Sequence, residues 1–388
     1  MVGPGPGCSA LGVGLARRRR RRWVRWGAGG VGGVVVVVVG VGWGLYLKLD
    51  GNITADEAAA AELRRYEKER PTSLVRGAQN ILLIGSDSRA GDENRKYGRD
   101  TGTERSDTTI LLHLAAKRDS ATAISVPRDL MVNVPSCRRP DGTRTPPMFT
   151  MFNHAFQAGG SACTIRTVEK LTDIRIDHHV VVDFHGFKEM VDAVDGVQVC
   201  LKEPVNDKAA ELRLPAGRVT LNGEQALGYV RARKSLGDGS DTDRMDRQQR
   251  FLGALVNKVR SNGVLLNPAK LYPVLDAATS SLTTDPGLAS LRGLYQLVRG
   301  VRDIPTEHVR FLTVPREAYV YNANRDQLVE PEAERLFERV RRDGPVEVAP
   351  RGGSGAEKAR ENRSRDPAES ASPAPTFRGN TAAEDTCE

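Results

Sequence analysis

Short apolar runs alternate with longer amphipathic stretches between about Asn80 and Arg341, and each pattern predicts one kind of element. The runs Ile81–Ile84, Thr109–Leu114 and Ala121–Val126 have the length and composition of buried strands. Helical spacing predicts helices at Asn222–Arg231 and from about Asp243 onward. This alternation predicts an α/β fold in which helices flank a central mixed sheet (α/β/α) within a single domain.

Charged residues stand at the ends of the predicted strands. The connection formed by residues 115–120 is short and polar, so the second and third strands are expected to form an antiparallel hairpin. Asp107, just before the second strand, and Arg128, just after the third, then converge on one sheet edge. Asp87 joins them if the first strand runs parallel to the third. Ligand sites in open α/β sheets favour such an edge.

The predicted helices carry a second charged group. The first helix ends near Arg231 and Arg233, and the next one begins near Asp243. Cations at a helix N-terminus are unfavourable with the helix dipole unless an anion is also present, and an N-terminus is itself an anion site. Helical spacing at i, i+3, i+4 and i+7 places four residues of the second helix on one face: Arg244, Arg247, Gln248 and Phe251.

The N-terminal region predicts a membrane anchor. Residues 27–47 contain no charge and include six consecutive valines, and seven arginines precede them within residues 17–25. Such a stretch is long enough to cross a bilayer, and the positive-inside rule leaves residues 1–26 in the cytoplasm. We favour an uncleaved anchor over a cleaved signal peptide because the apolar stretch is longer than a typical signal core. The chain is therefore expected in the cell membrane, single-pass, with its main domain outside.

The remaining segments complete the predicted organisation. Residues 48–77 are expected to form an extracytoplasmic stalk with a helix over residues 54–70, capped by Thr54. The folded domain is expected over residues 78–262 and 263–342. Arg316 and Asp326 could contribute to the pocket, but surface positions are favoured. Residues 343–388 are rich in Pro, Gly, Ser and charge, which predicts a disordered tail.

Four cysteines would face an oxidising space in this topology: Cys137, Cys163, Cys200 and Cys387. They allow three full pairings. We favour Cys137 with Cys163 because they flank one Pro- and Gly-rich loop. Free, packed cysteines are the alternative.

Several ordered motifs between residues 78 and 262 resemble the LytR-CpsA-Psr family. They are Asn80–Arg89, Arg105–Thr108, Ser125–Asp129, Ile176–Phe184, Tyr229–Arg233 and Asp241–Gln248. The resemblance implies a membrane-anchored phosphotransferase that moves a glycopolymer from an undecaprenyl (pyro)phosphate carrier to peptidoglycan. It also implies Mg²⁺ as cofactor, with the lipid-linked glycopolymer as donor and peptidoglycan as acceptor.

The resemblance assigns roles to residues of this chain. Asp87 and Asp107 match metal-binding positions, and Arg105, Arg128 and Asp129 are catalytic candidates. Mg²⁺ favours one or two carboxylates with water and phosphate oxygens, and arginine can bond two phosphate oxygens at once. Asp129 or Asp241 could act as general base. The pyrophosphate-binding candidates are Arg89, Arg128, Arg231, Arg233, Asp241, Arg244, Arg247 and Gln248. Structural salt bridging across the sheet edge is the alternative for the whole set.

Two other functions remain open. A polyprenyl-pyrophosphate pyrophosphatase would use the same site with water as nucleophile. A membrane-anchored cell-envelope regulator or transcriptional attenuator is disfavoured because residues 1–26 are too few for a DNA-binding domain. The net charge of +8 includes the seven N-terminal arginines, leaving about +1 for the rest, so no nucleic-acid partner is expected.

Overall fold

The computed structural model describes residues 39–86, 106–139, 141–207, 210–232, 241–261, 268–349 and 376–384. The chain divides into two compact units, Met1–Gly51 and Asn52–Glu388. Described residues of the first unit are helical from residue 39. No helix within the described ranges combines the length and apolar character needed to span a membrane. Residues 27–38 of the predicted anchor lie outside those ranges.

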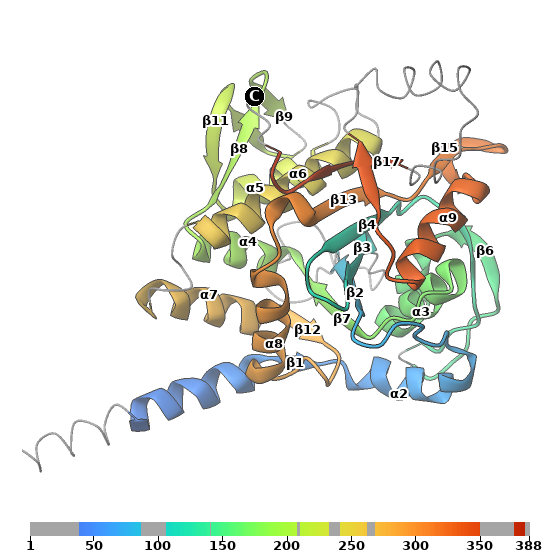
Figure 1. Ribbon diagram of the computed structural model, residues 1–388, viewed down its shortest axis with the longest axis horizontal. Coiled ribbons are helices and arrows are strands. Elements are labelled where there is room, and N and C mark those ends of the chain that lie inside the picture. Colours follow the sequence, from blue (N-terminus) through green and yellow to red (C-terminus); the bar gives the residue numbers. More distant parts are fainter. Residues whose placement is uncertain are drawn as a thin grey trace, which may run out of the picture. The chain divides into compact units, whose positions relative to one another are not determined.

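A nine-stranded mixed sheet organises the second unit (Figure 1). Its strands, in spatial order, are β1 (Thr54–Ala55), β12 (Leu282–Thr284), β7 (His178–Val182), β2 (Gln79–Ser86), β3 (Ser106–Leu114), β4 (Ala121–Val126), β13 (Val309–Thr313), β17 (Thr376–Thr381) and β16 (Glu347–Ala349).

The central strand directions match the prediction. β3 and β4 form the expected antiparallel hairpin, and β2 is antiparallel to β3 on its other side. β2 and β4 therefore run in the same direction. β7 is parallel to β2, and β13 is parallel to β4. The carboxyl ends of β2, β4, β7 and β13 consequently meet the start of β3 at one edge of the sheet.

Helices cover both faces of this sheet. α2 (Glu57–Arg65), α3 (His154–Thr172) and α9 (Glu330–Arg341) pack with Leu82, Leu111 and Ile124 in one core cluster. α8 (Leu291–Arg302) packs in a second cluster with Ile81 and Ile110. Adjacent strand residues fall into different clusters because side chains alternate between faces. The predicted α/β/α arrangement is thus confirmed for the described part of the chain.

A third core cluster joins the remaining helices to two small sheets. Its helices are α4 (Phe184–Ala193), α5 (Gly223–Arg231), α6 (Asp241–Ser261) and α7 (Pro268–Ser281). Its strand pairs are β8 (Val197–Leu201) with β11 (Gly217–Leu221), and β9 (Val205–Asp207) with β10 (Leu212–Leu214). Further elements of the unit are β5 (Met131–Val134) with β6 (Met148–Met151), β14 (Arg316–Tyr319) with β15 (Asn322–Leu328), and the 3₁₀ turns Glu67–Glu69 and Thr306–His308.

The segment predicted as a stalk folds against the sheet. The helix cap is Asp56 rather than Thr54, because Thr54 belongs to β1 and pairs with β12. The Asp56 carboxylate accepts a hydrogen bond from the Ala59 amide at 2.9 Å and lies 3.3 Å from Nε2 of buried His179. Burial would raise the pKa of Asp56, but these hydrogen bonds lower it. The predicted cap and extent of this helix were therefore wrong.

Part of the predicted disordered tail is ordered. β17 pairs with β13 and with β16, so both strands extend the main sheet. Phe377 is only 7% exposed and Ala382 is 1% exposed. These two short strands place few apolar residues in the core. The average composition of the tail is therefore polar and gives no sign of the strands. The prediction of disorder was wrong for residues 343–349 and 376–384, whereas residues 350–375 and 385–388 lie outside the described ranges.

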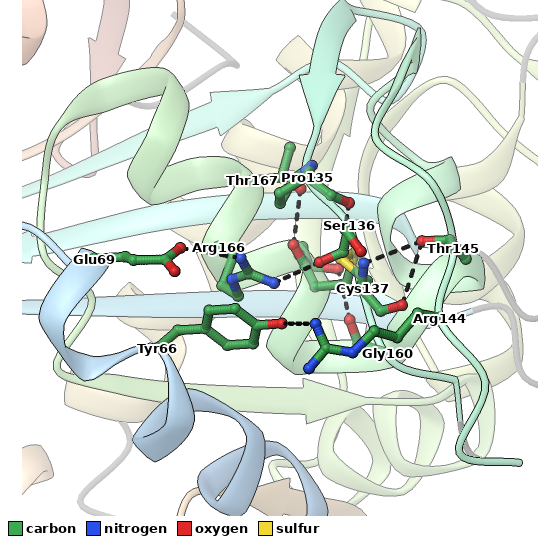
Figure 2. Close-up of a disulfide and its surroundings, with 12 residues drawn as sticks. Tyr66, Glu69, Pro135, Ser136, Cys137, Arg144, Thr145, Gly160, Arg166 and Thr167 are labelled. Atoms are coloured by element: carbon green, nitrogen blue, oxygen red, sulfur yellow. Dashed lines mark hydrogen bonds and ion pairs between the residues drawn. A yellow bond between two sulfur atoms is a disulfide. The ribbon is translucent and has the colours of Figure 1, made fainter.

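A disulfide between Cys137 and Cys163 confirms the favoured pairing and ties the segment after β5 to α3 (Figure 2). Both cysteines are buried. A Cβ on Gly159 would lie 2.8 Å from the Arg138 carbonyl and 3.0 Å from Cys137 Cβ, so only glycine permits this close approach. The Arg166 side chain lies over the Tyr66 ring and donates to the Ser136 carbonyl at 2.7 Å. Cys200 is also disulfide-bonded.

Removing this disulfide should destabilise the folded chain. Its cysteines are 26 residues apart in sequence. A loop of that length predicts a loss of about 3 to 4 kcal/mol for Cys137→Ala with Cys163→Ala, from unfolded-chain entropy. Chemical unfolding of the full chain in detergent measures the change. An unchanged midpoint in the double variant would contradict the structural role of the bridge.

Phe377→Ala tests whether β17 belongs to the folded sheet. Because the Phe377 ring packs in the core with α9, its removal should lower the free energy of unfolding by about 3 kcal/mol. The exposed neighbour Thr376 provides the matched control. Thr376→Ala should change the free energy of unfolding by less than about 0.5 kcal/mol. Equal, small effects of both substitutions would indicate that this segment does not contribute to the fold.

Candidate functional site

The candidate site lies where four strands end and β3 begins. Asp107 is the second residue of β3, and Arg128 follows β4 by two positions. Their separation of 21 residues in sequence is closed by the β3–β4 pairing, in which Thr109 lies opposite Val126. The structure therefore brings together two of the residues that strand direction predicted to converge.

Arg128 lies between two carboxylates. Its Nη1 donates to Oδ1 of Asp107 at 2.8 Å, and its Nε donates to Oδ2 of Asp129 at 3.3 Å. The three side chains are 19%, 33% and 21% exposed, in the order Arg128, Asp107 and Asp129. The group is sheltered but accessible, which suits the binding of a charged ligand.

The backbone around Arg128 is fixed by hydrogen bonds on both sides. The Asn153 amide donates to the Arg128 carbonyl at 3.0 Å, and the Asp326 amide donates to the Asp129 carbonyl at 3.2 Å. The Phe152 amide donates to the Leu130 carbonyl at 2.8 Å. This bonding fixes the backbone that carries Arg128 and Asp129 before any ligand binds.

The arginines of α6 are unusually buried for their type. Arg244 is 5% exposed and Arg247 is 6% exposed. Arg247 Nη2 donates to the Ala232 carbonyl, and Gln248 Nε2 donates to the Val230 carbonyl at 3.2 Å. These bonds satisfy carbonyls at the C-terminal end of α5, which have no partner within that helix. Burial lowers the pKa of Arg247, with partial compensation from nearby acidic groups and Tyr229.

Arg231 is the last residue of α5 and is exposed. Its guanidinium carbon lies 4.5 Å from the centroid of the Phe184 ring. Phe184 begins α4 two residues after the end of β7, so the contact lies near the carboxyl end of a central strand. The negative face of an aromatic ring attracts a cation at this distance, so the contact helps to position the guanidinium.

Several predicted site residues cannot be placed. Asp87, Arg89, Arg105 and Arg233 lie outside the described residues, and for Asp241 only the helical backbone is described. Residues 90–104 lie outside the described residues as well. Asp107, Arg128, Asp129, Arg231, Arg244, Arg247 and Gln248 are therefore the predicted site residues whose side chains the structure positions.

Sequence reasoning missed Gln249. This residue is 3% exposed, and its Nε2 donates to Ser125 Oγ at 3.1 Å and to Thr313 Oγ1 at 3.0 Å. It thereby fastens α6 to the ends of β4 and β13. Met245 and Leu252 lie at i−4 and i+3 from it, so a polar residue within an apolar helical stripe was the signal that could have identified it.

Arg316 and Asp326 are not surface residues, contrary to expectation. Their side chains are 16% and 10% exposed and form an ion pair between β14 and β15. Asp326 also forms an isolated parallel bridge with Leu130. The pair therefore supports the segment that carries Asp129. The sequence gave no indication that Asp326 contacts the segment after β4, because the two lie almost 200 residues apart.

One carboxylate of the described residues could serve the predicted magnesium site. No group of three or more His, Cys, Asp or Glu side chains is arranged around a metal position within the described ranges. Mg²⁺ does not require such a group, since one or two carboxylates with waters and phosphate oxygens are enough. Asp107 fits this role because Arg128 bonds only its Oδ1, and the carboxylate is one-third exposed at the sheet edge.

Comparisons with known proteins agree on one family. The LytR_cpsA_psr family model matches residues 46–342. The probable cell wall biosynthesis protein LcpB of Corynebacterium glutamicum is 38% identical over 59% of this chain and 54% of its own length. The chain spans about half the length of LcpB and of LcpA from the same organism.

A second relative is matched over more of its length. The polyisoprenyl-teichoic acid–peptidoglycan teichoic acid transferase TagU of Halalkalibacterium halodurans is 32% identical, over 68% of this chain and 79% of that protein. Among solved structures, the LytR-Csp2A-Psr enzyme from Actinomyces oris has a TM-score of 0.54 at 21% identity, covering 70% of this chain and 93% of the other. This structural likeness shows a common fold.

Gln249→Met tests the attachment of α6 to the sheet. The substitution keeps the side-chain volume but leaves the hydroxyls of Ser125 and Thr313 without this donor, so unfolding free energy should fall by about 1 to 3 kcal/mol. Chemical unfolding of the full chain measures the effect. Arg250→Met, at the exposed neighbouring position, should be nearly neutral. Comparable losses in both variants would contradict a specific role for Gln249.

Proposed function

The chain belongs to the LytR-CpsA-Psr family, and from this premise we propose that it is a transferase that attaches a glycopolymer to peptidoglycan. The family match over residues 46–342 and the named activity of TagU support the reaction class. The observation that carries the proposal is the fixed group formed by Arg128, Asp107 and Asp129 at the carboxyl edge of the sheet. This group has the charges needed to handle a phosphate ester in a sheltered site.

The proposed donor is a glycopolymer linked through a pyrophosphate to a polyprenyl carrier. A hydroxyl of peptidoglycan attacks the phosphorus next to the glycopolymer, and a new phosphorus–oxygen bond forms to that hydroxyl oxygen. The bond to the bridging oxygen breaks, so the polyprenyl phosphate leaves with the electron pair. The acceptor proton passes to a base, and the product is a phosphodiester between glycopolymer and peptidoglycan.

Arginine side chains are proposed to offset the charge on the pyrophosphate. Arg128 is oriented before binding by its two carboxylates, and its planar donors can bond two phosphate oxygens. Arg231 presents a second guanidinium from the exposed end of α5. Preorganised positive charge lowers the barrier most when it faces charge that develops in the transition state.

Mg²⁺ is the proposed cofactor, held by Asp107 and Asp87. When bound, it would supply positive charge next to the phosphate oxygens. Asp107 contributes the carboxylate that the structure describes, while Asp87 remains a prediction from the motif. Asp129 is the proposed proton acceptor, because its carboxylate adjoins Arg128 and is bonded by it through Oδ2 only.

We further propose that the protein is anchored in the cell membrane with its catalytic domain outside. The uncharged stretch at residues 27–47 and the arginines before it support this topology. The Cys137–Cys163 disulfide supports it independently, since such bridges persist in oxidising compartments outside the cytoplasm.

Asp107→Ala and Arg128→Ala should each abolish transfer. The full chain in detergent is incubated with a lipid-pyrophosphate-linked saccharide, peptidoglycan and Mg²⁺, and label bound to peptidoglycan is counted. Each substitution should reduce the rate by roughly a hundredfold or more, because it removes charge stabilisation at the reacting phosphate. Chelation of Mg²⁺ should have a comparable effect, reversed by adding the ion back.

Two exposed positions provide matched controls: Asp303→Ala, whose side chain is 87% exposed, and Arg335→Ala, on the outer face of α9. Both should transfer at the wild-type rate. Free phosphorylated saccharide, with none bound to peptidoglycan, would instead identify a pyrophosphatase. Full activity of Asp107→Ala or Arg128→Ala would overturn the site assignment.

A further inference from the structure

Two exposed aromatic rings, those of Phe149 and Tyr321, flank the half-buried ring of Tyr319. Phe149 on β6 lies 6.1 Å from Tyr319 on β14, centroid to centroid, and Tyr321 in the adjoining turn lies 5.4 Å from Tyr319. Phe149 is 53% exposed, Val320 is 71% exposed and Tyr321 is 86% exposed. These four residues, Phe149, Tyr319, Val320 and Tyr321, are here called the aromatic surface.

Folding does not explain the aromatic surface. None of its four residues belongs to the three core clusters. Contiguous exposed apolar groups of this kind mark interaction sites in soluble domains. The supporting hairpin is held in shape, because Gln327 Nε2 donates to Glu317 at 2.8 Å and its Oε1 accepts from the Val320 amide at 3.3 Å. The rings are therefore presented on a structured support, which reduces the entropy lost on binding.

The same hairpin reaches the catalytic edge. β14 begins at Arg316, three residues after the end of β13, and β15 contacts the Asp129 segment through the Asp326 amide. Asp326 lies four positions after Asn322, which places the aromatic turn about 13 Å from that contact at roughly 3.3 Å per residue. Figure 1 shows β15 projecting from the unit near β6. An extended polymer bound at the rings could reach Arg128 and Asp129 within a few units.

Neutral polar groups make up the turn that carries two of the rings, with Glu317 and Arg325 flanking it. The turn from Tyr319 to Asn324 contains no charged residue and two asparagines. Asn133, directly opposite Phe149 in the β5–β6 pair, is exposed as well. A pyranose ring has an apolar C–H face and a border of hydroxyl and amide groups, which matches aromatic faces bordered by carboxamides.

We propose that the aromatic surface docks the glycan strand of the peptidoglycan acceptor and directs one of its hydroxyls toward Arg128 and Asp129. This inference rests on the proposed function, because it assigns a partner to the same site. It predicts that peptidoglycan binding depends on Tyr319 and Tyr321 even when no donor is present. Acceptor binding and phosphate chemistry can thus be measured separately.

The test measures co-sedimentation of the full chain in detergent with purified peptidoglycan. The combined Tyr319→Ala and Tyr321→Ala variant should bind about tenfold more weakly or worse, as expected for loss of central aromatic contacts. The combined Tyr319→Phe and Tyr321→Phe variant should keep most of the affinity, because the rings remain. Tyr295→Ala is the matched control, since Tyr295 is 64% exposed on α8 and lies outside the aromatic surface. Chemical unfolding should be unchanged in all three.

The outcomes separate this inference from the proposed function. Unchanged binding by the double alanine variant, or an equal loss in Tyr295→Ala, overturns the docking surface even if the wild-type protein transfers glycopolymer. Conversely, tyrosine-dependent binding by a wild-type protein that never transfers upholds the surface and rejects the transferase. Hydrogen exchange tests whether the aromatic surface binds a membrane instead. Protection of residues 319–324 by lipid vesicles, but not by soluble glycan chains, overturns the inference.

Discussion

The direction of the central strands is the constraint on which the candidate site depends. β2 and β4 run parallel only because each is antiparallel to β3 between them. This arrangement gathers the ends of β2, β4, β7 and β13 around the start of β3, where Asp107 and Arg128 meet at 2.8 Å. Apolar residues on both faces of the strands enforce the register, since a shift by one residue would exchange the two cores.

Elements far apart in sequence then stabilise the edge from outside the sheet. Gln249 fastens α6 to β4 and β13, whereas the ion pair of Arg316 and Asp326 supports the backbone at Asp129. These contacts are buried and polar, so each would be costly if one partner were lost. The site is consequently held by the same bonds that attach the third core cluster and the β14–β15 hairpin to the main sheet.

Local patterns and short connections made four features predictable from the sequence. They are the central strands, the β3–β4 hairpin, the Asp107–Arg128 contact and the Cys137–Cys163 bridge. The helix cap at Asp56 could not, because β1 forms only by pairing with β12, more than 200 residues away. β17 escaped prediction for the same reason: its partner β13 supplies the sheet edge that a weakly apolar segment needs. Gln249 lies one residue beyond the motif that drew attention, and its partners are distant in sequence.

The charges around Arg128 limit how a pyrophosphate can bind. In the structure its guanidinium is bonded by two carboxylates, so these three groups together carry a net negative charge. A phosphate ester must therefore compete with Asp107 or Asp129 for the donors of Arg128, and it needs further positive charge nearby. Arg231 offers one such charge at the exposed end of α5. If the proposed Mg²⁺ shared the Asp107 carboxylate, it would weaken the hold of Asp107 on Arg128 and leave more donors of Arg128 for a phosphate ester.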